Sequence, residues 1–295
     1  MPTVLRHRPV ARLLLPVALL LVVLADVVLD PRRAQAGGRA PAEVVAAVTA
    51  AYGPGGVLAV VVARQHEAAS GLSIRAVEAR AARTAARSAD NGPVAHQPFP
   101  SASMVKLFLA EDVLHRARAG VLALTAADHE LLAEMIRRSD DPAASALWVR
   151  FDGAQAVRAV ADRYDLTGTE PPRRPGQWGQ ATTTARDLAR FLSLLPVLAH
   201  PEDAATLVGW MRSATALAAD GFDQRFGLFG TLPGRPAVKQ GWMCCVEGSR
   251  HLHSVAVIGS RVIVLLSEVP RTVGYDQARA WLTAAAAAVP APRGG

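Results

Sequence analysis

Two lysines mark the positions where this chain could carry out nucleophilic chemistry. Of its 32 basic residues, Lys106 and Lys239 are the only lysines, and the other 30 are arginines. A lysine amine can lose its proton, whereas an arginine guanidinium stays charged in a protein. Ser103 precedes Lys106 by three residues, which places both side chains on one face if a helix begins there. A neutral amine could then take the hydroxyl proton, so the pair predicts an activated serine nucleophile.

Further residues of this kind follow along the chain in a set order. Ser139 precedes two aspartates, of which Asp141 is the second, and Lys239 precedes Gln240 and Gly241. The order Ser-x-x-Lys, Ser-Asp-x and Lys-x-Gly resembles that of the penicillin-recognising serine hydrolases, the class A β-lactamases and D,D-peptidases. The resemblance covers about residues 40–290. It extends to the segments Pro98-Phe99-Pro100, Pro142-Ala143-Ala144, Pro175-Gly176, Thr182-Thr183-Thr184 and Asp187-Leu188.

This resemblance implies a role for each polar residue. Ser103 would be the acylated nucleophile, and Lys106 the amine that activates it. Ser139 would pass a proton towards the leaving nitrogen. Lys239 would hold the substrate carboxylate and tune Ser139 electrostatically. The substrate would be a β-lactam or a peptidoglycan stem peptide.

Backbone groups and one aromatic residue would shape the cleft. The resemblance implies that Gly241 would let its strand approach the substrate closely. The N–H groups of Ser103 and Trp242 would form the oxyanion hole. Trp178 lies in a loop rich in Pro and Gly, where it would either line the cleft or anchor the loop.

Three residues depart from the family pattern. Asp141 stands where the family usually has Asn, and a carboxylate only accepts hydrogen bonds. Near Lys106 it would also favour the charged amine over the neutral base. Gln240 replaces the usual hydroxyl residue and would alter one contact to the substrate carboxylate. Glu170 is the one acidic residue between positions 165 and 187, and it is either the base for deacylation or a solvated loop residue.

The elements that must position these residues follow from the spacing of apolar side chains. We expect a helix over 42–52, strands over 57–63 and 73–77, helices from 103 onward, strands over 238–246, 254–258 and 262–269, and a helix over 275–289. Strands at both ends of the chain with helices between them indicate one composite unit.

The predicted fold class is therefore α+β, the sandwich of serine β-lactamase type that the resemblance also implies. An antiparallel sheet is flanked by the N- and C-terminal helices and carries an inserted all-helical subdomain. We expect a single domain over 37–295. Its sheet part would take about residues 40–102 and 233–290, and its helical insertion about 103–232.

The N-terminus is typical of an export signal. Basic residues at positions 6, 8 and 12 precede an apolar run over 13–25, and Ala34-Gln35-Ala36 fits the small-residue cleavage rule. We expect residues 1–36 to be a signal peptide, which makes the mature protein secreted or extracytoplasmic. The alternative is an uncleaved membrane anchor, although the run is short for a spanning helix.

Other functions find little support in the composition. No basic stripe alternates with aromatic residues, which argues against nucleic-acid binding. His251 and His253 lack a third ligand at zinc spacing, so we expect no metal and no cofactor. Cys244 and Cys245 are adjacent, and we expect two small strand residues of which one or both are buried, with a vicinal disulfide as the alternative.

The sequence thus predicts an exported, monomeric serine hydrolase that acts on β-lactams or related cell-wall amides through an acyl-enzyme. Two alternatives stay open. One is a D,D-peptidase-like or slow penicillin-binding protein, and the other is a non-catalytic binding protein on the same fold.

Overall fold

The computed structural model describes residues 39–66 and 88–291. The expected signal peptide at 1–36 and the expected strand at 73–77 lie outside these residues. In the described part, no helix is long and apolar enough to cross a membrane.

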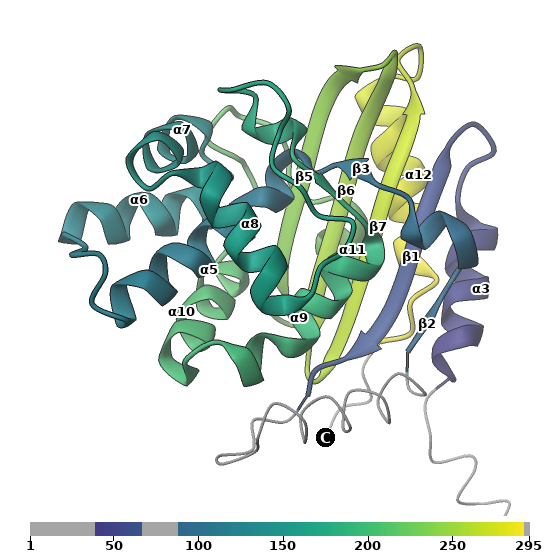
Figure 1. Ribbon diagram of the computed structural model, residues 1–295. Helices are drawn as coiled ribbons and strands as arrows, with labels where there is room; N and C mark the ends of the chain where they lie inside the picture. The colour runs from purple at the N-terminus through teal and green to yellow at the C-terminus, as the bar shows by residue number, and fades with distance from the viewer. Residues whose placement is uncertain (1–38, 67–87, 292–295) are drawn as a thin grey trace, which may run out of the picture. The chain divides into compact units, whose positions relative to one another are not determined.

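A five-stranded antiparallel sheet runs through the described chain in the order β2-β1-β7-β6-β5 (Figure 1). Its strands are β1 (Val57–Arg64), β2 (Ala89–Asp90), β5 (Ala237–Val246), β6 (Ser249–Ile258) and β7 (Arg261–Pro270). β1 is apolar almost throughout because both of its faces are covered, and its six central residues are buried. β5 is an edge strand of this sheet, so one side of its backbone is left for other partners.

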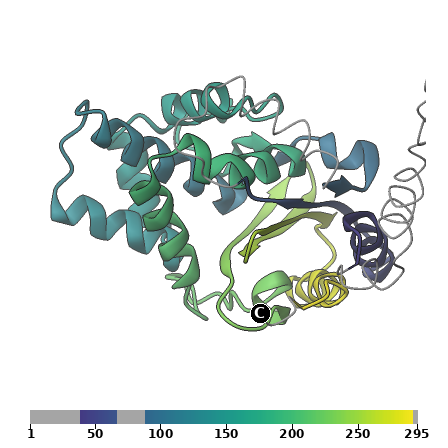
Figure 2. The same cartoon turned by 90° about the horizontal axis from the view of Figure 1, so that it is seen from below.

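Helices cover both faces of the sheet (Figure 2). One face carries α3 (Pro41–Ala51), α11 (Gly227–Thr231) and α12 (Tyr275–Ala287), and the other carries α9 (Ala185–Leu198). Successive strand residues point to opposite faces, so Val60 belongs to the core under α3 and α12, and Val61 to the core under α9. The sheet is therefore buried on both sides.

The remaining helices pack against one another and form the helical part, with α8 and α10 against α9 and α10 also against β5. They are α5 (Val105–Arg118), α6 (Ala126–Arg137), α7 (Asp141–Arg150), α8 (Gly153–Tyr164) and α10 (Pro201–Arg212). Thr125 and Asp128 form a capping box at the start of α6, and Thr184 caps α9. On α5, buried Glu111 accepts hydrogen bonds from Arg163 at 2.6 Å and from Tyr164 at 2.9 Å, which fixes α8 against α5.

Short elements connect the two parts beside the predicted nucleophile. They are the 3₁₀ turns η1 (Gly92–His96), η2 (Ala102–Met104) and η3 (Trp178–Gln180) and the paired strands β3 (Phe99–Pro100) and β4 (Thr182–Thr183). Pairing of β3 with β4 ties the segment before Ser103 to the end of the loop that contains Trp178.

The predicted α+β fold class is confirmed. Two details differ from the expectation. The strand expected at 254–258 begins at Ser249, because its polar first half still pairs with both neighbours. Helix α11 falls within the expected insertion but packs against α12 and β6 on the opposite face of the sheet.

Candidate active site

The segment around Ser103 combines a tight turn with a helix start. η2 leads directly into α5, so Lys106 lies in the first helical turn, three residues after Ser103. Ala102 has a φ of 47°, a left-handed conformation that is costly for a residue with a side chain. Strain of this kind is characteristic of functional sites, where the surrounding structure enforces it.

Ser139 joins the two lysines. It lies between α6 and α7, also with a positive φ, of 53°. The Lys239 amine donates to the Ser139 hydroxyl at 2.7 Å, and the Lys106 amine donates to the Ser139 carbonyl at 2.6 Å. All three side chains are at most 4% exposed. The predicted residues from α5, from the α6–α7 connection and from β5 therefore meet at one place.

Burial lowers the pKa of both lysines. Burial lowers the pKa of Lys106, and the nearby Asp141 carboxylate opposes that shift by favouring the ammonium form. Burial lowers the pKa of Lys239 well below its usual range, and repulsion from Lys106 lowers it further. Both amines therefore give up a proton more readily than a solvated lysine does, which favours a role as proton acceptor.

Asp141 forms the acidic side of this arrangement. It is the first residue of α7, whose N-terminus is capped by Asp140 through the Ala143 N–H at 2.8 Å. Asp141 Oδ1 lies 2.5 Å from the Lys106 amine, while its side chain is 63% exposed. The amine points towards Ser139 and Asp141, and within the described residues no hydrogen bond joins it to Ser103.

Strand β5 closes the opposite wall. A Cβ on Gly241 would lie 3.2 Å from the Ser103 backbone nitrogen, so this position has room for glycine and little more. Trp242 follows and stacks on Phe222 with ring centroids 4.5 Å apart. Ser103 and Trp242, whose N–H groups are the predicted oxyanion donors, line the same cleft.

This cleft has a volume of about 250 Å³. Trp178 does both things that the sequence left open. It lines the cleft, with the Lys106 amine 4.8 Å from its ring centroid, and its indole N–H donates to Ser145 at 3.2 Å. Gln177, Gln180 and Met243 also line the cleft and were not predicted, because none of them belongs to a chemical motif.

Two predicted site residues do not join this group. The Gln240 amide donates to the carbonyls of Gln224, at 3.1 Å, and Phe226, and accepts from Ser254 at 2.8 Å, on the other face of β5. It is 1% exposed and holds the chain that precedes α11. Glu170 is exposed, pairs through its backbone with Thr182, and is absent from the cleft lining.

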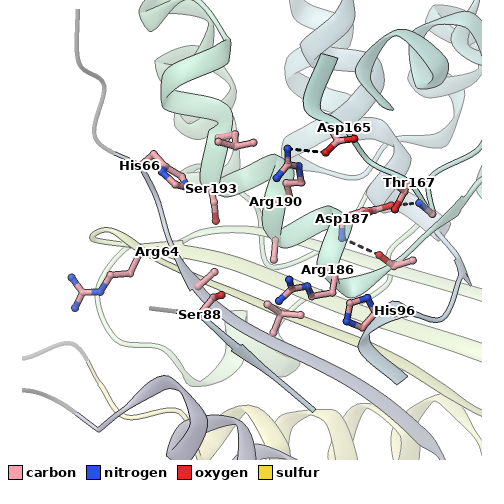
Figure 3. Close-up of a pocket in the computed structure, with 16 residues that line it drawn as sticks. Arg64, His66, Ser88, His96, Asp165, Thr167, Arg186, Asp187, Arg190 and Ser193 are labelled. Carbon is pink, nitrogen blue, oxygen red and sulfur yellow. Dashed lines mark hydrogen bonds and ion pairs between the residues drawn. The ribbon is translucent and has the colours of Figure 1, made fainter. Parts of the chain in front are cut away.

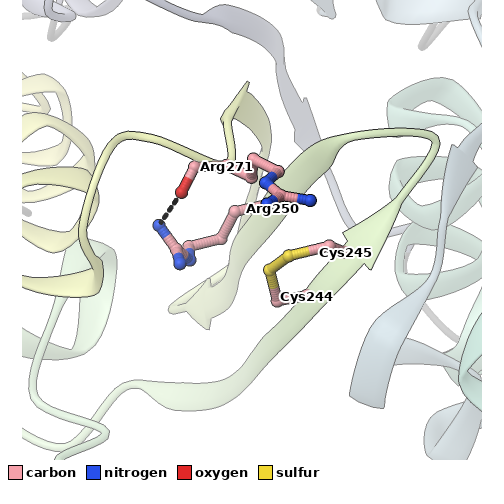
Figure 4. Close-up of a disulfide and its surroundings, with 4 residues drawn as sticks. All are labelled: Cys244, Cys245, Arg250 and Arg271. Carbon is pink, nitrogen blue, oxygen red and sulfur yellow. Dashed lines mark hydrogen bonds between the residues drawn. A yellow bond between two sulfur atoms is a disulfide. The ribbon is translucent and has the colours of Figure 1, made fainter.

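The cysteine expectation was wrong. Cys244 and Cys245 are both exposed and form a disulfide with each other at the end of β5, beside a register shift (Figure 4). Nearby, Arg250 donates to the Arg271 carbonyl at 3.2 Å. The disulfide is the vicinal alternative, and adjacency in the sequence does not distinguish a disulfide from two free thiols.

The two histidines have structural surroundings. His253 Nδ1 accepts from the Ser267 N–H at 3.2 Å, so Nε2 is left to donate to the Pro100 carbonyl at 2.8 Å. Burial lowers the pKa of His253 to about 3 and that of His251 to about 4. Among residues 39–66 and 88–291, no cluster of three or more His, Cys, Asp or Glu side chains could hold a metal ion.

A larger cavity of about 480 Å³ lies away from Ser103, between β1, η1 and α9 (Figure 3). Two of the arginines that line it form ion pairs, Arg186 with Asp90 at 2.8 Å and Arg190 with Asp165 at 3.0 Å. This cavity shares no lining residue with the cleft at Ser103, so a choice of site by volume alone would miss the predicted catalytic residues.

Comparison with known proteins agrees with this geometry. A family model described as the beta-lactamase enzyme family matches residues 129–289. Proteins named "Putative lipoprotein LppW" in Mycobacterium tuberculosis and Mycobacterium bovis are 37% identical over 199 residues. The match takes in 64% of this chain and 62% of each relative, so it spans less than two thirds of their length.

Solved structures show the same fold at low sequence identity. A β-lactamase from Sphaerobacter thermophilus is 17% identical with a TM-score of 0.58, covering 83% of this chain and 94% of that one. An ancestral class A β-lactamase is 20% identical with a TM-score of 0.58, covering 85% of this chain and 98% of that one.

Proposed function

The chain belongs to the beta-lactamase enzyme family, and from this premise we propose that it is an exported serine hydrolase that forms an acyl-enzyme on Ser103. The observation that carries the proposal is the placement of Ser139 between two buried lysines, one of which contacts Asp141 in the cleft that Ser103 lines. Its substrates would be β-lactams or related amides of the cell wall. The signal-like N-terminus and the name of the mycobacterial relatives support a location in the cell envelope.

Acylation would proceed through groups that already lie together. Neutral Lys106 takes the proton from Ser103 Oγ as that oxygen bonds to the substrate carbonyl carbon. The N–H groups of Ser103 and Trp242 donate to the developing oxyanion. As the C–N bond breaks, Ser139 gives its proton to the leaving nitrogen and recovers one from the lysines that contact it. Lys239 also attracts the substrate carboxylate.

Deacylation is expected to be slow. Hydrolysis needs a base that activates water beside the ester, and Asp141 is the one carboxylate among the described cleft residues. That carboxylate is held by Lys106 at 2.5 Å, and the Trp178 ring covers the same amine. Glu170 is exposed and outside the cleft. These contacts favour a second candidate, a D,D-peptidase-like or slow penicillin-binding protein with a long-lived adduct.

The test is covalent labelling with a fluorescent penicillin, followed by gel electrophoresis and intact mass. We expect a persistent adduct of one penicillin per chain that is lost in Ser103→Ala. Ser101→Ala is the matched control, since this buried hydroxyl, two residues upstream, contacts a local carbonyl and should be dispensable for labelling. Rapid turnover of a chromogenic cephalosporin would instead make the protein a fast β-lactamase. Absence of any adduct would leave a non-catalytic binding protein.

A further inference from the structure

Asp141 presents one bonded and one open carboxylate oxygen at the wall of the cleft. Oδ1 lies 2.5 Å from the Lys106 amine, and no donor among the described residues is within hydrogen-bond distance of Oδ2. The amine is buried at 1% exposure, whereas the Asp141 side chain is 63% exposed and lines the cleft with Ser103. A ligand in the cleft can therefore reach the open oxygen of a carboxylate.

We propose that this site selects substrates with a protonated amine near the scissile amide, and that Asp141 recognises the amine. The inference rests on the proposed acylation of Ser103 and names the substrate class for that site. An ammonium group beside the open oxygen gains a charge-assisted hydrogen bond. A substrate carbonyl in the same place would set two acceptors against each other, because a carboxylate cannot donate.

The charges around Lys106 strengthen this selection. Asp141, Asp140 and Asp220 all act electrostatically on the Lys106 amine in the direction of the charged form. Asp140 is committed to capping α7, and Asp220 accepts from the Phe222 N–H at 2.9 Å. When Lys106 is neutral, as acylation requires, Asp141 loses its counter-ion. A substrate ammonium restores that counter-ion and leaves the lysine free to accept the serine proton.

Two penicillins isolate the contribution of the substrate amine. Benzylpenicillin and ampicillin differ only by an amino group next to the side-chain carbonyl. The second-order rate constant of Ser103 acylation would be measured for both compounds, by competition with the fluorescent penicillin, at a pH where the amine is protonated. The quantity of interest is the ratio of the ampicillin rate constant to the benzylpenicillin rate constant.

In the Asp141→Asn variant we expect this ratio to fall by about tenfold, which corresponds to about 1.4 kcal/mol. Asparagine keeps the size of the side chain, and it can donate to a carbonyl. Asp220→Asn is the matched control, because it removes the same charge near Lys106 without lining the cleft, and it should leave the ratio within twofold. Melting temperatures of both variants confirm that the fold is retained.

A binding measurement separates this inference from the proposed function. Calorimetry would give the affinity of both penicillins for the Ser103→Ala protein and for the double variant that also carries Asp141→Asn. If both compounds acylate the protein but the ratio does not change, the ammonium preference is refuted and the acylating function stands. If neither compound acylates it but Asp141→Asn still weakens ampicillin binding selectively, the preference stands and the acylating function fails. If neither compound reacts or binds, both proposals are refuted.

Discussion

Replacement of Gly241 by alanine tests whether the close approach of β5 to Ser103 builds the oxyanion site. The new Cβ would lie 3.2 Å from the Ser103 nitrogen, 3.3 Å from the Ala102 Cβ and 3.4 Å from the Met104 Cε. The Met104 methyl can swing away, but the Ser103 nitrogen is backbone and follows a residue already held at a φ of 47°. Relief of the contact therefore requires η2 to move from β5 by a few tenths of an ångström.

The magnitude follows from what that shift moves. Ser103 and Trp242 supply the two predicted donors, one on each side of the contact, and loss of one such donor typically costs about 10² to 10³ in rate. A partial displacement should therefore slow acylation by about 10- to 100-fold. Overpacking of this kind also costs roughly 1 kcal/mol or more of stability. The assay is the second-order rate constant for labelling by the fluorescent penicillin.

Gly209→Ala is the matched control for this substitution. Gly209 is exposed within α10, and its Cβ would meet no heavy atom within 4 Å. Alanine there should leave labelling unchanged and raise stability by about 0.5–1 kcal/mol, because glycine is a poor helix former. Labelling of Gly241→Ala within twofold of the parent would refute the role assigned to the β5–η2 contact.

Four further outcomes are expected. Lys106→Arg should abolish labelling, because a guanidinium cannot act as a base; retained labelling in intact mass would remove Lys106 from that role. In Asp141→Asn, the acid limb of the labelling rate against pH should move to lower pH, because the carboxylate that favours the charged amine is gone; an unmoved limb would separate the two residues. Neither ring nitrogen of buried His251 has a hydrogen-bond partner among the described residues. His251→Leu should therefore raise the melting temperature, with roughly 1–3 kcal/mol added to the free energy of unfolding. Burial lowers the pKa of this histidine to about 4, so below about pH 6.5 its protonation in the unfolded chain makes the folded state less stable as the pH falls towards 4. His251→Leu removes this loss, so the gain in stability should be larger at pH 5 than at pH 7.5. The double variant Cys244→Ser and Cys245→Ser should change the melting temperature little, since a disulfide between neighbours closes almost no loop; a drop of more than about 5 °C would contradict this.

Residue types and chain order predicted much of the candidate site. Ser103, Lys106, Ser139 and Lys239 each belong to a short motif whose chemistry needs that side chain. The structure joins Lys106, Ser139 and Lys239 by hydrogen bonds, and it places Ser103 in the cleft lining with Asp141, which contacts Lys106. Gly241 was predicted for close approach of its strand to the substrate, and in the structure its strand lies so close to η2 that a Cβ would be crowded there. Such local requirements can be read without knowledge of the fold.

What depends on the direction of a side chain could not be read in the same way. Gln240 follows Lys239 directly, and alternation along β5 sends its amide to the opposite face, where it finds two carbonyls and a hydroxyl. The position of Trp178 over Lys106 depends on how an irregular loop folds back, for which no periodic signal exists. No sequence pattern predicts the burial of a polar side chain such as His251 either.

The order of the strands has a consequence for how the protein folds. β1 pairs with β7, with Val57 opposite Glu268, so the sheet joins segments that are more than 200 residues apart. Contacts this distant along the chain form slowly, because a long loop must close before they contribute. Lys239 lies on β5, which pairs with β6, and β6 is joined to β1 only through β7. During synthesis, Ser103 and Lys106 therefore leave the ribosome well before Lys239, and the site is complete only after β5, β6 and β7 have been synthesised and paired.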